Sequence, residues 1–143
     1  MARFVRDLIA KKGTAVFKVA PQDSVRAAIE QMAERGVGAL LVMTDERLEG
    51  IVSERDYARQ VILKGRNSND TPVSDIMSAR VVCVEPERTL EECMALMTDK
   101  RIRHLPVISG GKVTGVISIG DVVSAVIAEK EFQIQQLESY ISG

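Results

Sequence analysis

The chain has 143 residues, of which 45% are hydrophobic but only 3% aromatic, so we expect an aliphatic core in one domain or in two small halves that share it. Nineteen basic and twenty acidic residues give a net charge of -1, which provides no electrostatic attraction for nucleic acid or anionic lipid. The apolar runs are far shorter than the roughly 20 residues that a membrane span needs. We therefore expect a soluble, cytoplasmic protein that binds neither nucleic acid nor membrane.

The first half of the chain predicts short strands alternating with helices. Apolar residues recur at helical spacing after Ser24, a suitable N-cap, and Gly36 is a natural residue to end that helix. The other expected elements, in chain order, are a lead-in helix at 5–9, strands at 16–19, 39–43 and 48–52, and a second helix that ends near Gly65. The polar stretch 66–72 is expected to be a linker.

The second half repeats the first. A shift of 65 residues aligns 21–62 with 86–127 without a gap. Strands are accordingly expected at 81–84, 104–108 and 113–117, and Thr89 takes the place of the first N-cap. The chain is therefore predicted to be α+β, with two tandem β-α-β-β-α repeats at 5–65 and 73–128. Each repeat alone would expose a sheet face and a helical stripe, so we expect the two copies to pack together.

The tail at 129–143 is longer than the repeat requires. Ile134, Leu137 and Ile141 continue a helical apolar stripe among polar residues. This helix could pack back on its own domain, or it could pack on a second subunit; the pattern leaves both possibilities open.

A Gly-x-x-Ser-x-x-Asp motif occurs in both repeats, as Gly50 to Asp56 and as Gly115 to Asp121. Serine and aspartate at this spacing, where a strand gives way to a helix, form a capping box. The same helix N-terminus could also attract a polar ligand, and an aspartate there could accept both hydroxyl hydrogens of a ribose diol. Spacing alone favours capping, but it leaves the two glycines unexplained.

Catalytic side chains are scarce. His104 is the only histidine, and on this ground we expect it to be a rim or packing residue rather than a catalyst. Cys83 and Cys93 lack metal-ligand or redox spacing and are expected in the core. We therefore expect neither an enzyme nor a metal site nor a catalytic cofactor.

The two motifs, with the strand sequences 37–42 and 102–107, resemble those of a pair of CBS domains, also called a Bateman module, in a stand-alone tandem CBS protein. The resemblance covers roughly residues 5–128. It implies repeats packed with pseudo-two-fold symmetry and an adenosine nucleotide bound in each of two clefts between them. AMP is the first expectation, and ATP, ADP or NAD are further candidates.

The resemblance also implies roles for individual residues. Asp56 and Asp121 would bind ribose hydroxyls, with Ser53 and Ser118 near the ribose or phosphate. The Ser118 motif is expected to face a set of residues in the first repeat, namely Ala15, Phe17, Val37, Gly38 and Ala39. The Ser53 motif is expected to face a second set, namely Arg80, Val82, Ile102, Arg103 and His104.

The two expected clefts differ in charge. Arg55 stands where the second repeat has Gly120, and Arg103 with His104 stands where the first has Gly38 with Ala39. We therefore expect more positive charge, and firmer anchoring of phosphates, in the Asp56 cleft.

The predicted function is a regulatory module that binds adenosine nucleotides and alters its interaction with an unidentified effector protein. CBS pairs commonly associate, so a homodimer is expected. The alternative is a structural homodimerisation module without a physiological nucleotide ligand.

Overall fold

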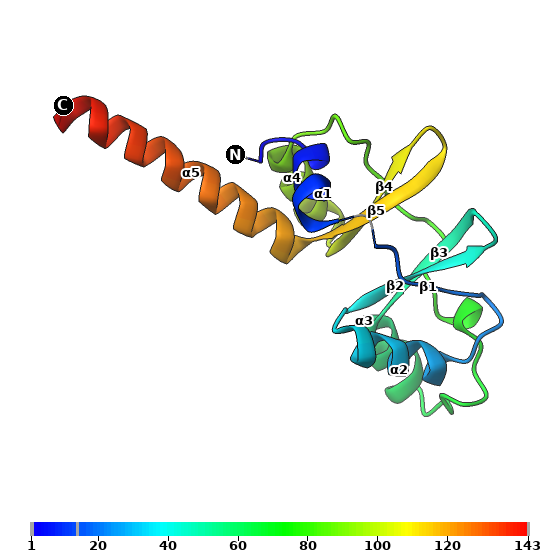
Figure 1. The fold of residues 1–143 in the computed structure, drawn as a ribbon. Coiled ribbons are helices and arrows are strands. Elements are labelled where there is room, and N and C mark those ends of the chain that lie inside the picture. The colour runs from blue at the N-terminus through cyan, green and yellow to red at the C-terminus, as the bar shows by residue number, and fades with distance from the viewer. Residues whose placement is uncertain (1, 14, 143) are drawn as a thin grey trace. The chain divides into compact units, whose positions relative to one another are not determined.

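The computed structural model describes residues 2–13 and 15–142, which form an α+β fold in two compact units (Figure 1). One unit comprises Val16–Val81. The other combines the chain up to Ala15 with the chain from Val82 onward. The predicted fold class and the duplicated organisation are confirmed, because each unit contains a helix followed by an antiparallel strand pair and a second helix.

The unit Val16–Val81 is built on a three-stranded sheet in the order β1-β2-β3. Its strands are β1 (Lys18–Val19), β2 (Ala39–Thr44) and β3 (Arg47–Ser53). Its helices are α2 (Val25–Arg35), α3 (Glu54–Tyr57), a π-helical turn (Ala58–Ile62) and a 3-10 turn (Val73–Asp75). Strand β1 is parallel to β2, and β2 is antiparallel to β3. Side chains from the sheet and from α2 bury one apolar cluster between them.

The second unit has a two-stranded sheet and three helices. Its strands are β4 (His104–Ser109) and β5 (Lys112–Ser118). Its helices are α1 (Val5–Lys12), α4 (Leu90–Lys100) and α5 (Ile119–Ser142). The strand predicted at 81–84 is reduced to one parallel bridge between Val84 and Val107, and the strand predicted at 16–19 to two residues. Pro21 and Pro86 limit both strands, because proline has no N–H to continue a ladder.

Helices α2 and α4 begin at the predicted N-caps, and α2 ends at the predicted glycine. The Ser24 hydroxyl accepts a hydrogen bond from the Ala27 backbone, and the Thr89 hydroxyl accepts one from Glu92. Helix α2 ends at Gly36, whose φ of 67° is readily available only to glycine. Helix α4 ends instead at Arg101, which has a φ of 55°.

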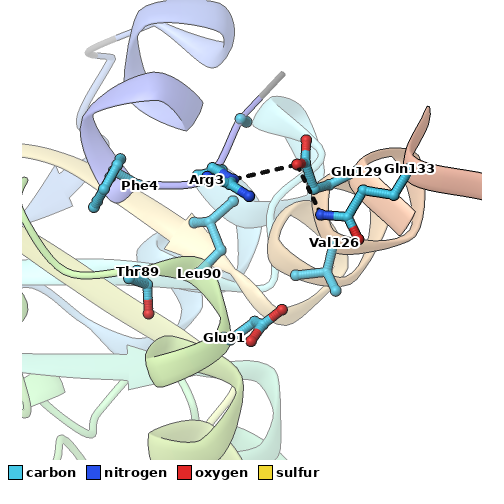
Figure 2. Close-up of a pocket in the computed structure, with 9 residues that line it drawn as sticks. Arg3, Phe4, Thr89, Leu90, Glu91, Val126, Glu129 and Gln133 are labelled. Atoms are coloured by element: carbon cyan, nitrogen blue, oxygen red, sulfur yellow. Dashed lines mark hydrogen bonds and ion pairs between the residues drawn. The ribbon is translucent and has the colours of Figure 1, made fainter. Parts of the chain in front are cut away.

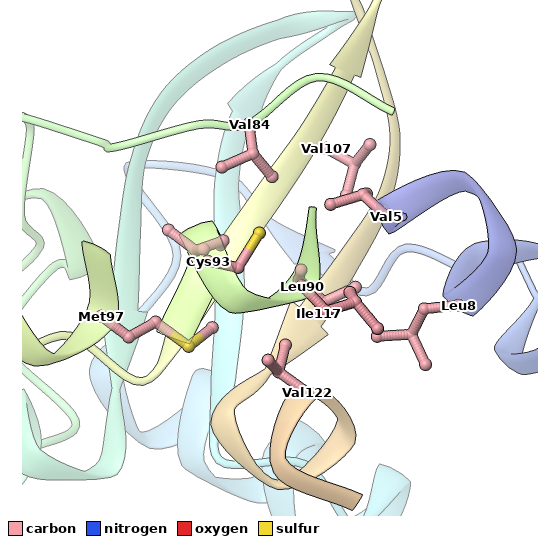
Figure 3. Packing of buried hydrophobic residues seen from close by; sticks show 10 residues of the cluster. Val5, Leu8, Val84, Leu90, Cys93, Met97, Val107, Ile117 and Val122 are labelled. Atoms are coloured by element: carbon pink, nitrogen blue, oxygen red, sulfur yellow. The ribbon is translucent and has the colours of Figure 1, made fainter. Parts of the chain in front are cut away.

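The lead-in segments are exchanged between the repeats. Val5 and Leu8 of α1 lie in the core of the second repeat, beside Leu90 and Ile117 (Figure 3). Backbone hydrogen bonds hold this segment, among them those from Val5 N to Arg88 O (2.8 Å) and from Leu90 N to Arg3 O (2.9 Å). In the same way, Val73 and Ile76 precede the second repeat in the chain but lie in the core of the first. The sequence repeats 5–65 and 73–128 therefore differ from the compact units.

Helix α5 joins the second helix of its repeat to the predicted tail without a break. Val122 is buried, and Ala125 and Val126 pack against the same core. Every residue from Ile134 to Ser142 is exposed, and Figure 1 shows this end of α5 extending away from the rest of its unit. The tail therefore packs on its own unit only in its first part; Gly143 lies outside the described residues.

Candidate functional site

Both Ser-x-x-Asp motifs form capping boxes. In the first, the Ser53 hydroxyl accepts from the Asp56 backbone N–H (3.2 Å), and the Ser53 N–H donates to Asp56 Oδ2 (2.9 Å). In the second, the same bonds join Ser118 and Asp121 at 3.1 and 2.9 Å. Capping uses Oδ2 of each carboxylate. Oδ1 of both aspartates accepts no hydrogen bond from the part of the chain that the structure describes, and both residues are only half-buried.

Lys12 at the end of α1 brings a positive charge to the second motif. Its Nζ lies 2.5 Å from Asp121 Oδ2 and donates to the Val116 carbonyl oxygen at 2.7 Å. Burial raises the pKa of Asp121, but the hydrogen bonds from Lys12 and Ser118 outweigh it and hold the pKa below its usual value. Asp121 is therefore ionised and paired with Lys12 at neutral pH.

Lys12 is a site residue that the sequence analysis missed. The lead-in segments 5–9 and 73–77 correspond at an offset of 68 residues, and the same offset places Lys12 opposite Arg80. Arg80 is exposed and lies two residues beyond Ser78, which exchanges backbone hydrogen bonds with Ile51 (2.9 and 3.0 Å). Each lead-in therefore ends in a basic residue in the same unit as one of the two motifs.

Each motif also lies beside strand residues of its own repeat. Ala39 is paired with Ser53 across β2 and β3, and the Glu54 N–H donates to the Gly38 carbonyl oxygen at 3.1 Å. His104 is likewise paired with Ser118, and the Ile119 N–H donates to the Arg103 carbonyl oxygen at 2.8 Å. The pairing of each motif with strand residues of the other repeat stays a prediction.

His104 does not add positive charge at neutral pH. Burial, and then the nearby charge of Lys12, lower the pKa of His104, while Asp121 raises it by a smaller amount. The imidazole is therefore neutral, which removes part of the charge difference expected from Arg103 and His104. Since Lys12 also lies at Asp121, the sequence-based reason for assigning more positive charge to the Asp56 motif is weakened.

The other predicted site residues lie at the edges of these elements. The Phe17 carbonyl oxygen accepts from the Leu41 N–H (3.1 Å), and the Arg35 guanidinium lies 4.9 Å from the centre of the Phe17 ring. Val37 and Ile102 each follow a left-handed helix cap and donate to the preceding helix at 3.0 Å. Three further predicted residues occupy exposed or half-buried positions: Ala15, Arg55 and Val82.

The two motif glycines have a packing explanation. A Cβ at Gly50 would lie 2.7 Å from the Ser78 carbonyl oxygen, and a Cβ at Gly115 would lie 2.6 Å from Ile9 Cδ1. Both close neighbours belong to lead-in segments. The backbone of the crossing lead-in therefore excludes a side chain at Gly50, whereas at Gly115 the flexible Ile9 side chain would have to shift.

The cysteines provide no reactive thiol. Burial raises the pKa of Cys83, and burial together with the charge of Glu92 raises the pKa of Cys93 to about 11. Across residues 2–13 and 15–142, no three His, Cys, Asp or Glu side chains are placed to hold a metal ion.

A cavity of about 250 Å³ lies elsewhere, among the N-terminal segment, the start of α4 and the middle of α5 (Figure 2). Glu129 Oε1 accepts there from Arg3 Nε (3.3 Å) and Gln133 Nε2 (3.2 Å), whereas the buried Oε2 has no partner in the described chain. None of the predicted site residues lines this cavity.

Comparison with known proteins identifies the repeats. The family model of the CBS domain matches residues 5–62 and 73–128. The mitochondrial CBS domain-containing protein CBSX3 of Arabidopsis thaliana is 44% identical over 126 aligned positions, and the alignment covers 85% of this chain and 61% of that protein. This chain therefore spans about three fifths of the plant relative.

Solved structures show the same fold. A CBS-domain protein from Burkholderia ambifaria is 50% identical, with a TM-score of 0.84 over 89% of this chain and 95% of that one. A CBS domain protein of Pyrobaculum aerophilum, solved in complex with AMP, is 21% identical, with a TM-score of 0.74 over 82% of this chain and 88% of that one.

Among the described residues, no helix is long and apolar enough to cross a membrane.

Proposed function

The chain belongs to the CBS domain family, and on this basis we propose that it is a regulatory module that binds an adenosine nucleotide at its Ser-x-x-Asp motifs and thereby alters its interaction with a partner protein. AMP is the first candidate, and ADP, ATP and NAD share the same ribose and adenine. The AMP complex of the Pyrobaculum aerophilum protein supports this choice. The proposed role is one of binding and regulation.

The free Oδ1 atom of each motif aspartate is the observation that carries the proposal. A cap needs one carboxylate oxygen, and Asp56 and Asp121 each use Oδ2 for it. The remaining oxygen can accept hydroxyl hydrogens from a ribose diol while the helix stays capped. The same side chain thus serves both interpretations that the sequence left open.

Lys12 adds a second element to the Asp121 motif. Its ammonium is bound to Asp121 and to the Val116 carbonyl oxygen. A nucleotide phosphate near the ribose would offer Lys12 a stronger anionic partner. Binding of a phosphorylated nucleoside would then exchange the Lys12–Asp121 pair for a Lys12–phosphate pair and a ribose–Asp121 pair.

A thermal-shift titration tests nucleotide binding directly. Ligand at about 100 times its dissociation constant should add roughly 2.7 kcal/mol to the unfolding free energy. AMP, ADP, ATP, NAD and S-adenosylmethionine would be compared on the intact chain. Asp56→Asn and Asp121→Asn should each reduce the shift, because an amide keeps an oxygen for the cap but replaces the charged acceptor.

The chain offers a matched control for these variants. Thr89 and Glu92 form a third capping box, with the Thr89 N–H donating to Glu92 Oε1 at 3.1 Å, and it belongs to neither motif. Glu92→Gln should therefore leave the nucleotide shift unchanged. If no nucleotide shifts the parent chain, the proposed function is wrong and the structural dimerisation module is favoured.

A further inference from the structure

The exposed end of α5 carries an apolar surface. Ile127, Ile134, Leu137 and Ile141 are 52%, 53%, 62% and 82% exposed. We call these four residues the α5 seam. The helix from Ile134 onward makes no buried contact within the described chain, and a short unsupported helical segment is only marginally stable in water. The seam thus lies on the part of α5 that most needs a partner.

The spacing of the seam specifies the kind of partner. Ile127, Ile134 and Ile141 recur every seven residues, and Leu137 lies three residues after the second isoleucine. In coiled-coil terms the isoleucines occupy position a and the leucine position d. Isoleucine at a with leucine at d favours a parallel pair of helices.

The neighbouring charges agree with a parallel pair. Glu131 and Glu138 occupy the e positions, and Gln133 occupies the intervening g position. In a parallel pair, Gln133 of one chain faces Glu138 of the other, so no like charges oppose one another. An antiparallel pair would bring the glutamates at e together.

The seam is weakest at its first d position, residue 130, which is not apolar. Lys130 occupies it, and its Nζ lies 3.3 Å from Glu91 Oε1 of the same unit. This cation is therefore held at the side of its own domain, and the contact between copies concentrates at residues 134–141.

We propose that the α5 seam is an interface on which a second copy of this chain pairs its own α5 in parallel and in register. The proposal rests on the exposure and heptad spacing of the seam and not on nucleotide binding. The seam is about 21 Å long, or two heptads. A coiled coil this short adds to a dimer rather than forming a strong one alone, so its removal should weaken association by about tenfold or more.

Sedimentation velocity over a micromolar concentration series tests the interface. The double variant Ile134→Glu/Leu137→Glu places two charges on the seam, and Gln136→Glu/Ser139→Glu adds the same two charges on the opposite face as a control. We expect a dimer for the parent chain and the control, and a dissociation constant about tenfold larger or more for the seam variant. Circular dichroism would verify that all three chains are folded.

Cysteine cross-linking tests the orientation. Ile141→Cys places identical thiols opposite each other only in a parallel, in-register pair, whereas Ser139→Cys points its thiol away from the seam. The Ile141→Cys chain should form an intermolecular disulfide faster than the Ser139→Cys chain, with the parent chain as background.

Three results would overturn the proposal: a monomeric parent chain, equal dissociation of the seam and control variants, or equal cross-linking of the two cysteine variants. A thermal-shift measurement with AMP on the seam variant separates this outcome from the proposed function. If any of these results is obtained while AMP still shifts the seam variant, the interface proposal is wrong and the proposed nucleotide binding is retained.

Discussion

Replacing Lys12 with methionine removes the ammonium that contacts Asp121 while it keeps most of the apolar stem. The two side chains are 38% and 29% exposed, so the ion pair is only partly shielded from solvent. Pairs of this kind contribute about 0.2–1 kcal/mol. Lys12→Met should therefore lower the stability of the chain only slightly, and its main effect should be on ligand binding.

The effect should depend on whether the ligand carries a phosphate. Adenosine offers a ribose diol but no anion, so it gains no contact with Lys12, and loss of this cation leaves Asp121 a stronger hydrogen-bond acceptor. Lys12→Met should therefore leave adenosine affinity unchanged or raise it up to about fivefold. AMP offers Lys12 a phosphate, and a hydrogen bond to a charged group contributes about 1.5–3 kcal/mol. AMP affinity should fall about 10- to 100-fold.

Isothermal titration calorimetry in an Asp56→Asn background would isolate the Asp121 motif. Lys11→Met is the matched control, because Lys11 is the exposed neighbour on α1 and has no ion pair among the described residues. Equal changes in adenosine and AMP affinity, or the same changes in the Lys11 variant, would refute the exchange of partners at Lys12.

Further expected outcomes concern stability and reactivity. Gly50→Ala should destabilise more than Gly115→Ala in urea denaturation, because the added methyl meets a backbone carbonyl at Gly50 and the end of a flexible side chain at Gly115. The lowered pKa of Asp121 contributes stability above about pH 4, which is lost as the pH falls through the folded-state pKa; this acid-dependent loss should be smaller in Lys12→Met. Cys93, with a pKa of about 11, should react with a thiol reagent at neutral pH only after denaturation.

The repeat, its α+β class and its helix caps could be predicted from the sequence because they depend on local patterns. Ser24, Thr89 and Gly36 act through hydrogen bonds or dihedral angles within a few residues. The exchange of the lead-ins could not be predicted in this way. Val5 and Val73 are both buried apolar residues, and nothing in their own segments specifies which of two similar cores each one fills.

The candidate site was predictable to a similar degree. Ser53 and Asp56, like their counterparts in the second repeat, were found from motif spacing, and the structure shows that the capping interpretation is correct in geometry. Lys12 was missed because the lead-ins align at an offset of 68 residues and the rest of the repeat at 65. The strand predicted at 81–84 was too long because a short apolar run before a proline has the same sequence pattern as a strand.

The exchange of the lead-ins makes each repeat depend on the other for a complete core. One repeat taken alone would leave its core open where the other lead-in belongs, and its own lead-in would have no core to fill. Such a repeat is complete only with a second copy that returns the missing piece, as in a domain-swapped dimer. The present chain resembles a covalently fused form of such a dimer, so we expect that cutting it between the repeats would yield two fragments that fold only when they are mixed.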